Sequence, residues 1–352
     1  VGFQAGGVGV ITGDHNVVVG KGAFLNATSA AKSVFIGKHA GGGGVITGDD
    51  NVCIGEDAGF DLIGGYSNVL IGTNAGENFT DNYGCVAIGH GALDAANTGE
   101  HYNIAIGLNA LGAETSGADG CIAIGYAALS YQNRDASANT AIGHLALINL
   151  GNSVTYGGQR NTAVGFQAGG NGVFGGGSDG NGDDNTCIGN GAGYGISAGT
   201  DNVCVGSAAG EGLTTATYNV LIGKGAGVAM TDNSGNVAIG YGALDGCNGG
   251  EHYNIAVGRN ALGADIAEST YCVAVGDSAL ALQNANVKNT AIGGLAGDAI
   301  TNGGGNTLVG YMAGSAVVSS ADNTVLGHNA FNTGTGAENT MIGSAAGRSA
   351  TG

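Results

Sequence analysis

Short alternating apolar segments recur along the whole chain, and each ends in a glycine that precedes a more polar stretch. One copy is Asn103-Ile-Ala-Ile-Gly107 and another is Asn339-Thr-Met-Ile-Gly343. A period of two over β-branched residues is typical of a β-strand. No copy shows the 3.6-residue period of an amphipathic helix. The pattern therefore predicts a short strand in every copy.

The copies follow one another at a nearly constant interval. Successive motif glycines are 16, 17 or 18 residues apart, except for 22 residues after Gly143 and 24 residues after Gly165. The motif glycines are Gly2, Gly20, Gly37, Gly55, Gly72, Gly89, Gly107, Gly125, Gly143, Gly165, Gly189, Gly206, Gly223, Gly240, Gly258, Gly276, Gly293, Gly310, Gly327 and Gly343. Because so short a unit cannot bury a core alone, it must stack on its neighbours.

The sequence thus predicts an all-β fold, a β-solenoid of about 20 coils of 17–18 residues whose equivalent strands stack in parallel. We expect one continuous solenoid over residues 1–352, with a nine-coil duplication that relates 51–143 to 202–293. Longer loops are expected at 148–160 and 170–184, where the two long intervals fall. Each coil is also expected to contain a second short strand, for example over 109–113.

The columns of the repeat suggest which side chains face inward. The residue before each motif glycine is Val, Ile or Leu, and the third residue after it is always Ala. We expect the aliphatic column before the glycine, and the Val, Ile or Thr column two residues earlier, to line the interior. The Ala and Gly columns are then expected on the opposite side, where another segment approaches the backbone.

A column of asparagines precedes the strands. The residue four before the motif glycine is Asn in most copies, Cys at 85, 121 and 272, and Ser at 33. Stacked Asn side chains can form an amide ladder, and Asn tolerates left-handed turns. The predicted structural ladder comprises Asn51, Asn68, Asn103, Asn139, Asn161, Asn185, Asn202, Asn219, Asn236, Asn254, Asn289, Asn306, Asn323 and Asn339.

Composition and charge narrow the function. The chain has 75 glycines and no proline, which excludes collagen, and it is 43% hydrophobic and only 10% charged, which disfavours disorder. A net charge of −18 argues against nucleic-acid and anionic-membrane partners. No apolar run approaches the ~18 residues of a transmembrane helix. The absence of proline fits unbroken parallel ladders.

The Asn-x-Ala-Ile-Gly-x-x-Ala repeats resemble the β-roll repeats of trimeric autotransporter adhesin heads. They also resemble the Asn-Thr-Ala-Ile-Gly repeats of bacterial and phage tail-fibre-like proteins. The resemblance implies a left-handed β-roll, often a homotrimer, in an extracellular, cell-surface or virion fibre. It extends over the whole chain at the level of the repeat.

These observations predict a structural, non-enzymatic subunit of an extracellular fibre or filament, with head-to-tail polymerisation as one arrangement. The expected partners are copies of the chain itself. The alternative is a homotrimeric adhesin or tail-fibre domain that binds a cell-surface glycan or receptor. Its contacts would be aromatic residues near the long loops, namely Tyr156, Phe166 and Phe174.

Acidic residues gather before the Asn column, at Asp183, Asp184 and Asp201 among others. Stacked carboxylates repel unless they are solvated or bridged, and Ca²⁺ binds such oxygen ligands. We favour solvated turn acids and leave calcium as the alternative; no other cofactor is expected. A polysaccharide-cleaving site would need a partner acid beside Asp184 and Asp201, and the sequence offers none.

Three further features have simpler interpretations. The seven cysteines lack metal-ligand spacing, and we interpret them as buried small hydrophobes, although Cys187 and Cys204 stack within disulfide range. The duplicated Glu-His-Tyr-Asn segments at 100–103 and 251–254 are interpreted as surface turns. A row of threonines from Thr290 to Thr340 would suggest ice binding, but its column is expected to face inward.

Overall fold

Nineteen parallel strands of three residues each, and no helix, make up the regular structure of the described chain. The computed structural model describes residues 1–7, 11–96, 99–113, 117–131, 137–149, 158–170, 182–264, 266, 269–284, 288–315, 317–333 and 335–348. These described residues contain no helix that is long and apolar enough to cross a membrane. The chain divides into two compact units, Val1–Asp184 and Asn185–Gly352, and each is described by itself.

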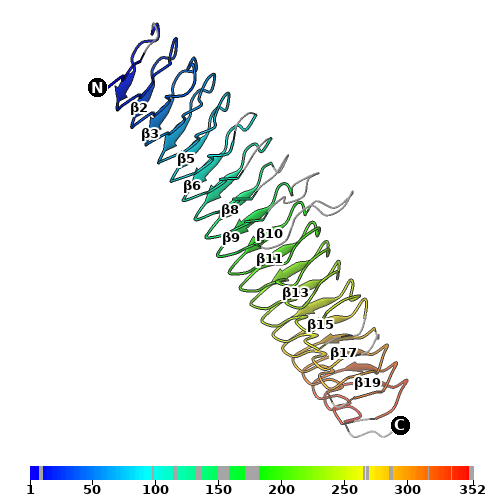
Figure 1. Cartoon of the computed structure of the whole chain (residues 1–352). Helices are drawn as coiled ribbons and strands as arrows, with labels where there is room; N and C mark the ends of the chain where they lie inside the picture. Colours follow the sequence, from blue (N-terminus) through cyan, green and yellow to red (C-terminus); the bar gives the residue numbers. More distant parts are fainter. Residues whose placement is uncertain are drawn as a thin grey trace. The chain divides into compact units, whose positions relative to one another are not determined.

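Within each unit, successive strands lie side by side in chain order (Figure 1). The first unit contains β1 (Val17–Val19), β2 (Val34–Ile36), β3 (Val52–Ile54), β4 (Val69–Ile71), β5 (Val86–Ile88), β6 (Ile104–Ile106), β7 (Ile122–Ile124), β8 (Thr140–Ile142) and β9 (Thr162–Val164). The second contains β10 (Thr186–Ile188), β11 (Val203–Val205), β12 (Val220–Ile222), β13 (Val237–Ile239), β14 (Ile255–Val257), β15 (Val273–Val275), β16 (Thr290–Ile292), β17 (Thr307–Val309), β18 (Thr324–Leu326) and β19 (Thr340–Ile342).

The repeat fixes the register of these strands. Val69, Leu70 and Ile71 of β4 pair with Val86, Ala87 and Ile88 of β5, and the other pairs within a unit align their motifs in the same way. The predicted β-solenoid with parallel stacking is therefore confirmed. Strands occur in every copy except the one that ends at Gly2. The handedness stays a prediction.

The expected second strand is wrong. Residues 107–113 form turns after β6, and the same turn follows the strands of the other described coils. Asn109 and Leu111 adopt left-handed conformations, with φ of 53° and 49°. Left-handed residues at alternate positions curl the backbone and cannot belong to an extended strand. Over the described residues, the strand of a coil is therefore followed by a tightly curved return and not by a second strand.

The expected direction of the strand side chains is also wrong. The central residue of β5, Ala87, is fully buried, whereas Val86 and Ile88 on either side of it are partly exposed. The same alternation holds in nearly all strands. The Ala column after the motif glycine is buried as well, for example at Ala92. A coil of 17–18 residues encloses too little space for two β-branched columns, so the small residues turn inward.

Large and small residues share this narrow interior. In most coils with Ala at the strand centre, the fourth residue after the motif glycine is Leu, as in Ala87 and Leu93. Where the centre is Leu or Cys, that later position is Gly, as in Leu70 and Gly76. A Cβ on Gly76 would lie 2.9 Å from Cδ2 of Leu70. The two positions thus fill one volume at the close packing typical of protein cores.

The motif glycine allows the coils to approach one another. Gly72 has φ of +135°, and a Cβ there would lie 2.4 Å from the carbonyl oxygen of Gly89 in the next coil. Only glycine combines this conformation with so short a distance. The segment that the Gly column meets is therefore the neighbouring coil.

Buried asparagines join the coils through both ends of their amide groups. Asn219 Oδ1 accepts hydrogen bonds from the backbone N and the Nδ2 of Asn236, at 2.9 and 3.3 Å. Its Nδ2 donates to Asn202 Oδ1 at 2.9 Å and to the carbonyl of Asn233 at 2.8 Å. The Asn219 amide thus connects three coils, in an interior where an unpaired polar group is costly.

Asn219→Ala is expected to destabilise the second unit by about 3 kcal/mol. The substitution removes an acceptor from the backbone N of Asn236 and a donor from Asn202 Oδ1 and the carbonyl of Asn233. The measurement is the urea midpoint of the full chain, followed by far-ultraviolet circular dichroism.

The matched control is Asn190→Ala, an exposed asparagine of the same unit. Its expected effect is within about 0.5 kcal/mol, as for most surface substitutions. Equal shifts for the two variants would show that the buried amides do not stabilise the stack.

Candidate functional site

The outward side of the strands forms an uncharged surface, here called the strand face. It consists of the first and third residues of each strand, all of them partly or fully exposed. In the first unit these are Val17, Val19, Val34, Ile36, Val52, Ile54, Val69, Ile71, Val86, Ile88, Ile104, Ile106, Ile122, Ile124, Thr140, Ile142, Thr162 and Val164. In the second they are Thr186, Ile188, Val203, Val205, Val220, Ile222, Val237, Ile239, Ile255, Val257, Val273, Val275, Thr290, Ile292, Thr307, Val309, Thr324, Leu326, Thr340 and Ile342.

A more polar column borders the strand face. It contains the residue that follows each motif glycine and is called the rim. Ion pairs join neighbouring rim residues: Lys38 Nζ lies 2.5 Å from Glu56 Oε1, and Arg259 Nε lies 2.8 Å from Asp277 Oδ1. Such exposed pairs contribute little to stability. The rim thus places charges beside the strand face while the face itself has none.

Aromatic rings stack along the rim of the first unit. His144 lies between Tyr126 and Phe166, with ring centroids 4.9 and 5.3 Å away and interplanar angles of 21° and 15°. Phe166 is 47% exposed, but its ring is layered on His144. His144 thus covers one face of the Phe166 ring, and glycan contact at Phe166 stays a prediction. Tyr156 and Phe174, the other predicted glycan contacts, lie outside the described residues.

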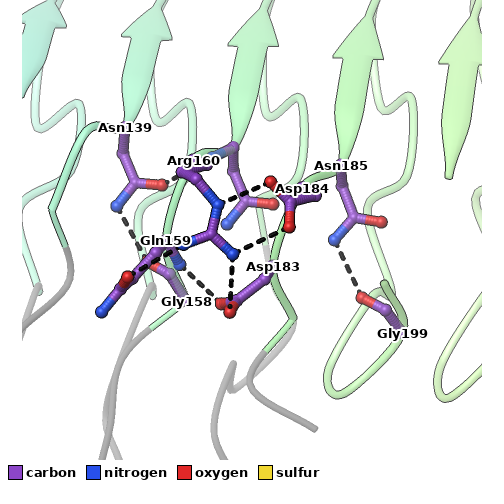
Figure 2. Close-up of polar contacts among 9 residues, drawn as sticks. Asn139, Gly158, Gln159, Arg160, Asp183, Asp184, Asn185 and Gly199 are labelled. Carbon is purple, nitrogen blue, oxygen red and sulfur yellow. Dashed lines mark hydrogen bonds and ion pairs between the residues drawn. The ribbon is translucent and has the colours of Figure 1, made fainter. Parts of the chain in front are cut away.

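Arg160 forms ion pairs with two of the predicted calcium ligands (Figure 2). Its Nε donates to Asp184 Oδ1 at 2.7 Å, and its Nη2 donates to Asp184 Oδ2 at 2.8 Å and to Asp183 Oδ2 at 3.3 Å. The hydrogen bonds from Arg160 hold the pKa of Asp184 below its usual value. Bidentate pairing of this kind satisfies a carboxylate without a metal ion.

Asp201, the third predicted calcium ligand, belongs to the second unit and is exposed. Within the described ranges, no three His, Cys, Asp or Glu side chains gather where they could hold a metal ion. Calcium at Asp183, Asp184 and Asp201 stays a prediction, and Arg160 provides a competing partner for the first two.

All seven cysteines are buried as thiols and not as disulfides. Cys187 of β10 and Cys204 of β11 are register partners at the strand centres. Burial raises the pKa of the Cys53 thiol, and it raises that of Cys85 to about 11. Thiols that remain protonated are poor nucleophiles, which agrees with their interpretation as small apolar residues.

The threonine row faces outward, contrary to the expectation from the sequence. Thr290, Thr307, Thr324 and Thr340 are successive register partners on β16–β19. They belong to the strand face because the narrow interior accepts the central residue of each strand instead. The threonine row is therefore open to solvent.

Two glutamates interpreted as surface residues are buried. Glu100 Oε2 accepts from Asn82 Nδ2 at 2.7 Å, and Glu100 Oε1 accepts from the backbone N of Gly117 at 3.2 Å. Glu251 has the equivalent contact with Asn233 Nδ2 in the second unit. Burial raises the pKa of Glu100. The two residues of each Glu-Asn pair are 18 residues apart in the chain, so only the stacking register shows that they meet.

We expect Glu100→Gln to change how stability depends on pH. The pKa of Glu100 in the folded state is higher than the ~4.3 of an unfolded glutamate. The folded state therefore binds the proton of this carboxyl group more tightly than the unfolded state does. Wild-type stability from this group is therefore highest below pH ~4.3 and declines as pH rises through the raised pKa. Over this pH range, the free energy of unfolding of the variant should rise relative to that of the wild type, by up to about 1.4 kcal/mol per unit of pKa difference.

Urea midpoints between pH 4 and 8 measure this difference. Glu56→Gln is the opposite control, since its hydrogen bond to Lys38 lowers the pKa of Glu56. That substitution should remove stability at neutral pH and have less effect at low pH. Parallel pH profiles for wild type and Glu100→Gln would contradict the assignment.

Comparison with protein-family models, curated proteins and solved structures finds no significant match. The solenoid fold therefore rests on the chain's own strand register. The resemblance of its repeats to adhesin heads and tail fibres stays a prediction.

Proposed function

We propose that the chain is a structural subunit of an extracellular fibre or filament, and that copies of it associate laterally through the strand face. This lateral contact replaces head-to-tail stacking as the arrangement we favour. Its central support is the chemistry of the strand face. The described strands expose only Val, Ile, Leu and Thr there.

Charged residues are distributed unevenly between the strand face and the rest of the chain. The chain has 27 acidic and 9 basic residues, yet none of them occupies the strand face of a described strand. Depletion of charge at the centre, with polar residues around it, is the usual composition of a protein interface. The rim supplies that polar border, with the Lys38–Glu56 and Arg259–Asp277 pairs.

The size of the strand face also supports association. Ten stacked strands in the second unit extend over roughly 45 Å at ~4.8 Å per strand. With side chains about 10 Å across, the apolar strip covers on the order of 450 Å², the size of the largest apolar patch on a typical monomer, which is often a functional surface. The nine strands of the first unit present a strip of similar size.

Replacing two central residues of the strand face with lysine should separate the copies. We expect Ile222→Lys/Ile239→Lys to shift the protein from an oligomer toward a monomer of 33.8 kDa. Both residues are 37% exposed, so lysine can reach solvent in the monomer but would be desolvated in the assembly. Light scattering after size-exclusion chromatography measures the mass.

Asn190→Lys/Ser207→Lys is the matched control, because it adds the same two charges to the rim of the same unit. It should leave the oligomeric state unchanged. A monomeric wild type, or equal dissociation of both double variants, would contradict lateral association through the strand face.

One feature favours a second function, adsorption to ice. The row from Thr290 to Thr340 presents hydroxyl and methyl groups in register beside a second, aliphatic row. At the fixed spacing of parallel strands, such rows can hold surface water in a regular lattice. The threonine row occupies the last four described strands of the second unit.

Thermal hysteresis of the full chain tests this second function. Thr307→Lys/Thr324→Lys should abolish hysteresis, whereas Asn190→Lys/Ser207→Lys should preserve it. No hysteresis in the wild type would exclude ice adsorption and would leave lateral association unaffected.

A further inference from the structure

Two tyrosines that correspond through the internal duplication lie in the same way against the preceding coil. Tyr102 belongs to the first unit and Tyr253 to the second, and both have φ of 59°. A Cβ on Gly84, the neighbour of Tyr102 in the preceding coil, would lie 2.9 Å from Cδ1 and 3.2 Å from Cε1 of that ring. A Cβ on Gly235 would lie 2.7 and 2.9 Å from the same atoms of Tyr253. Each ring therefore covers a glycine in the same orientation.

In the second unit, the next coil places a further ring on this tyrosine. Tyr271 is the neighbour of Tyr253 in the register of β14 and β15. The ring centroids are 5.4 Å apart, and the ring planes differ by 10°. Stacked pairs at this separation are favourable beyond the apolar area that they bury. The side of Tyr253 that is turned toward the next coil thus accepts a phenol ring.

In the first unit, a glycine takes the place of that second tyrosine. Gly120 is the neighbour of Tyr102 in the register of β6 and β7, and it corresponds to Tyr271 through the duplication. A Cβ on Gly120 would meet no described atom within 4 Å, and Tyr102 is 63% exposed. The coil after that has Ala138 at the same repeat position. We call the space between Tyr102 and Ala138, above Gly120, the open slot.

The coil spacing sets the width of the open slot. Tyr102 and Ala138 occupy the same repeat position two coils apart, which corresponds to ~9.6 Å at ~4.8 Å per coil. A flat ring makes van der Waals contact at about 3.5 Å from each neighbour. One planar ring therefore fits between the two positions, as one ring follows Tyr253 in the second unit.

The surroundings of the open slot orient its aromatic wall and give it a charge. Tyr83, in the preceding coil, packs its ring against Tyr102 at a centroid distance of 5.2 Å and an angle of 87°. Asp119 directly precedes Gly120 and is exposed, and its Oδ1 accepts a hydrogen bond from the backbone N of His101 at 2.7 Å. With this carboxylate and a net charge of −18, the chain favours neutral or cationic ligands over anionic ones.

We propose that the open slot binds the phenol ring of a small neutral or cationic molecule, stacked on Tyr102 as Tyr271 is stacked on Tyr253. The chain itself supplies the model for the ligand, because the duplicated site carries a phenol ring at this place. The open slot lies in the turn before the strand and is separate from the strand face. We expect a dissociation constant on the order of 1 mM, since one ring face and no closed cavity hold the ligand.

A fluorine NMR titration of fluorotyramine with the full chain tests the proposal. The wild type should show one site. Gly120→Tyr should weaken binding by at least about tenfold, because the new ring would occupy the slot. The substitution should be tolerated, since Gly120 has φ of 65° and Tyr271 has φ of 62°.

Gly191→Tyr is the matched control. Gly191 has φ of 62°, and a Cβ there would also meet no described atom within 4 Å, but it belongs to the other unit. This variant adds the same side chain in the same conformation and should bind fluorotyramine as the wild type does.

Tyr271→Gly gives the complementary test, a gain of binding. Removing this ring should open an equivalent slot on Tyr253, so that the variant has two sites of similar affinity. The anionic analogue fluorohydroxyphenylacetate should bind several-fold more weakly than fluorotyramine to both. Equal affinity for the anionic analogue would overturn the charge preference.

Three results would overturn binding at the open slot: unchanged affinity in Gly120→Tyr, a single site in Tyr271→Gly, or no binding to the wild type at millimolar probe. Light scattering of the same variants identifies a different occupant. If Gly120→Tyr dissociates a wild-type oligomer and Gly191→Tyr does not, the slot holds a side chain of a second copy, and the assignment to a small molecule is wrong.

Discussion

The distance between adjacent coils constrains everything else in this molecule. Backbone hydrogen bonds join each coil to both neighbours: Asn74 N donates to the carbonyl of Glu56 in the preceding coil, and Gly76 N donates to that of Ala92 in the next. Bonds of this length leave no room for a Cβ at the motif glycine, and they require an N–H at nearly every position. The column of motif glycines and the absence of proline follow from this spacing.

The fold could be predicted from the regular spacing of the repeats, but the curvature of each coil could not. Strand positions followed from the period and the alternation around residues such as Ile104 and Ile106. Their direction was mistaken because β-branched residues were assumed to prefer the interior. The reciprocal use of Ala87 with Leu93, and Leu70 with Gly76, was a signal in the sequence for an interior shared between two positions. The prediction of a second strand was wrong because non-glycine residues such as Leu111 adopt a left-handed conformation that their residue type does not indicate.

The candidate sites depend on the same stacking. Columns of the repeat become surfaces: uncharged strand positions form one face, and ion pairs and rings follow beside it. From sequence alone, Asn82 and Glu100 are ordinary turn residues, because their contact depends on which repeat positions meet across coils. The acidic pair Asp183 and Asp184 attracted attention in the sequence, yet the structure gives it an arginine partner.

The central claim is that the strand face is covered by other copies of the chain. Electron microscopy of the unmodified protein at neutral pH tests it most directly. The account predicts assemblies in which solenoids run side by side with their strand faces turned toward one another. Single solenoids with the strand face open to solvent, at all concentrations examined, would contradict it.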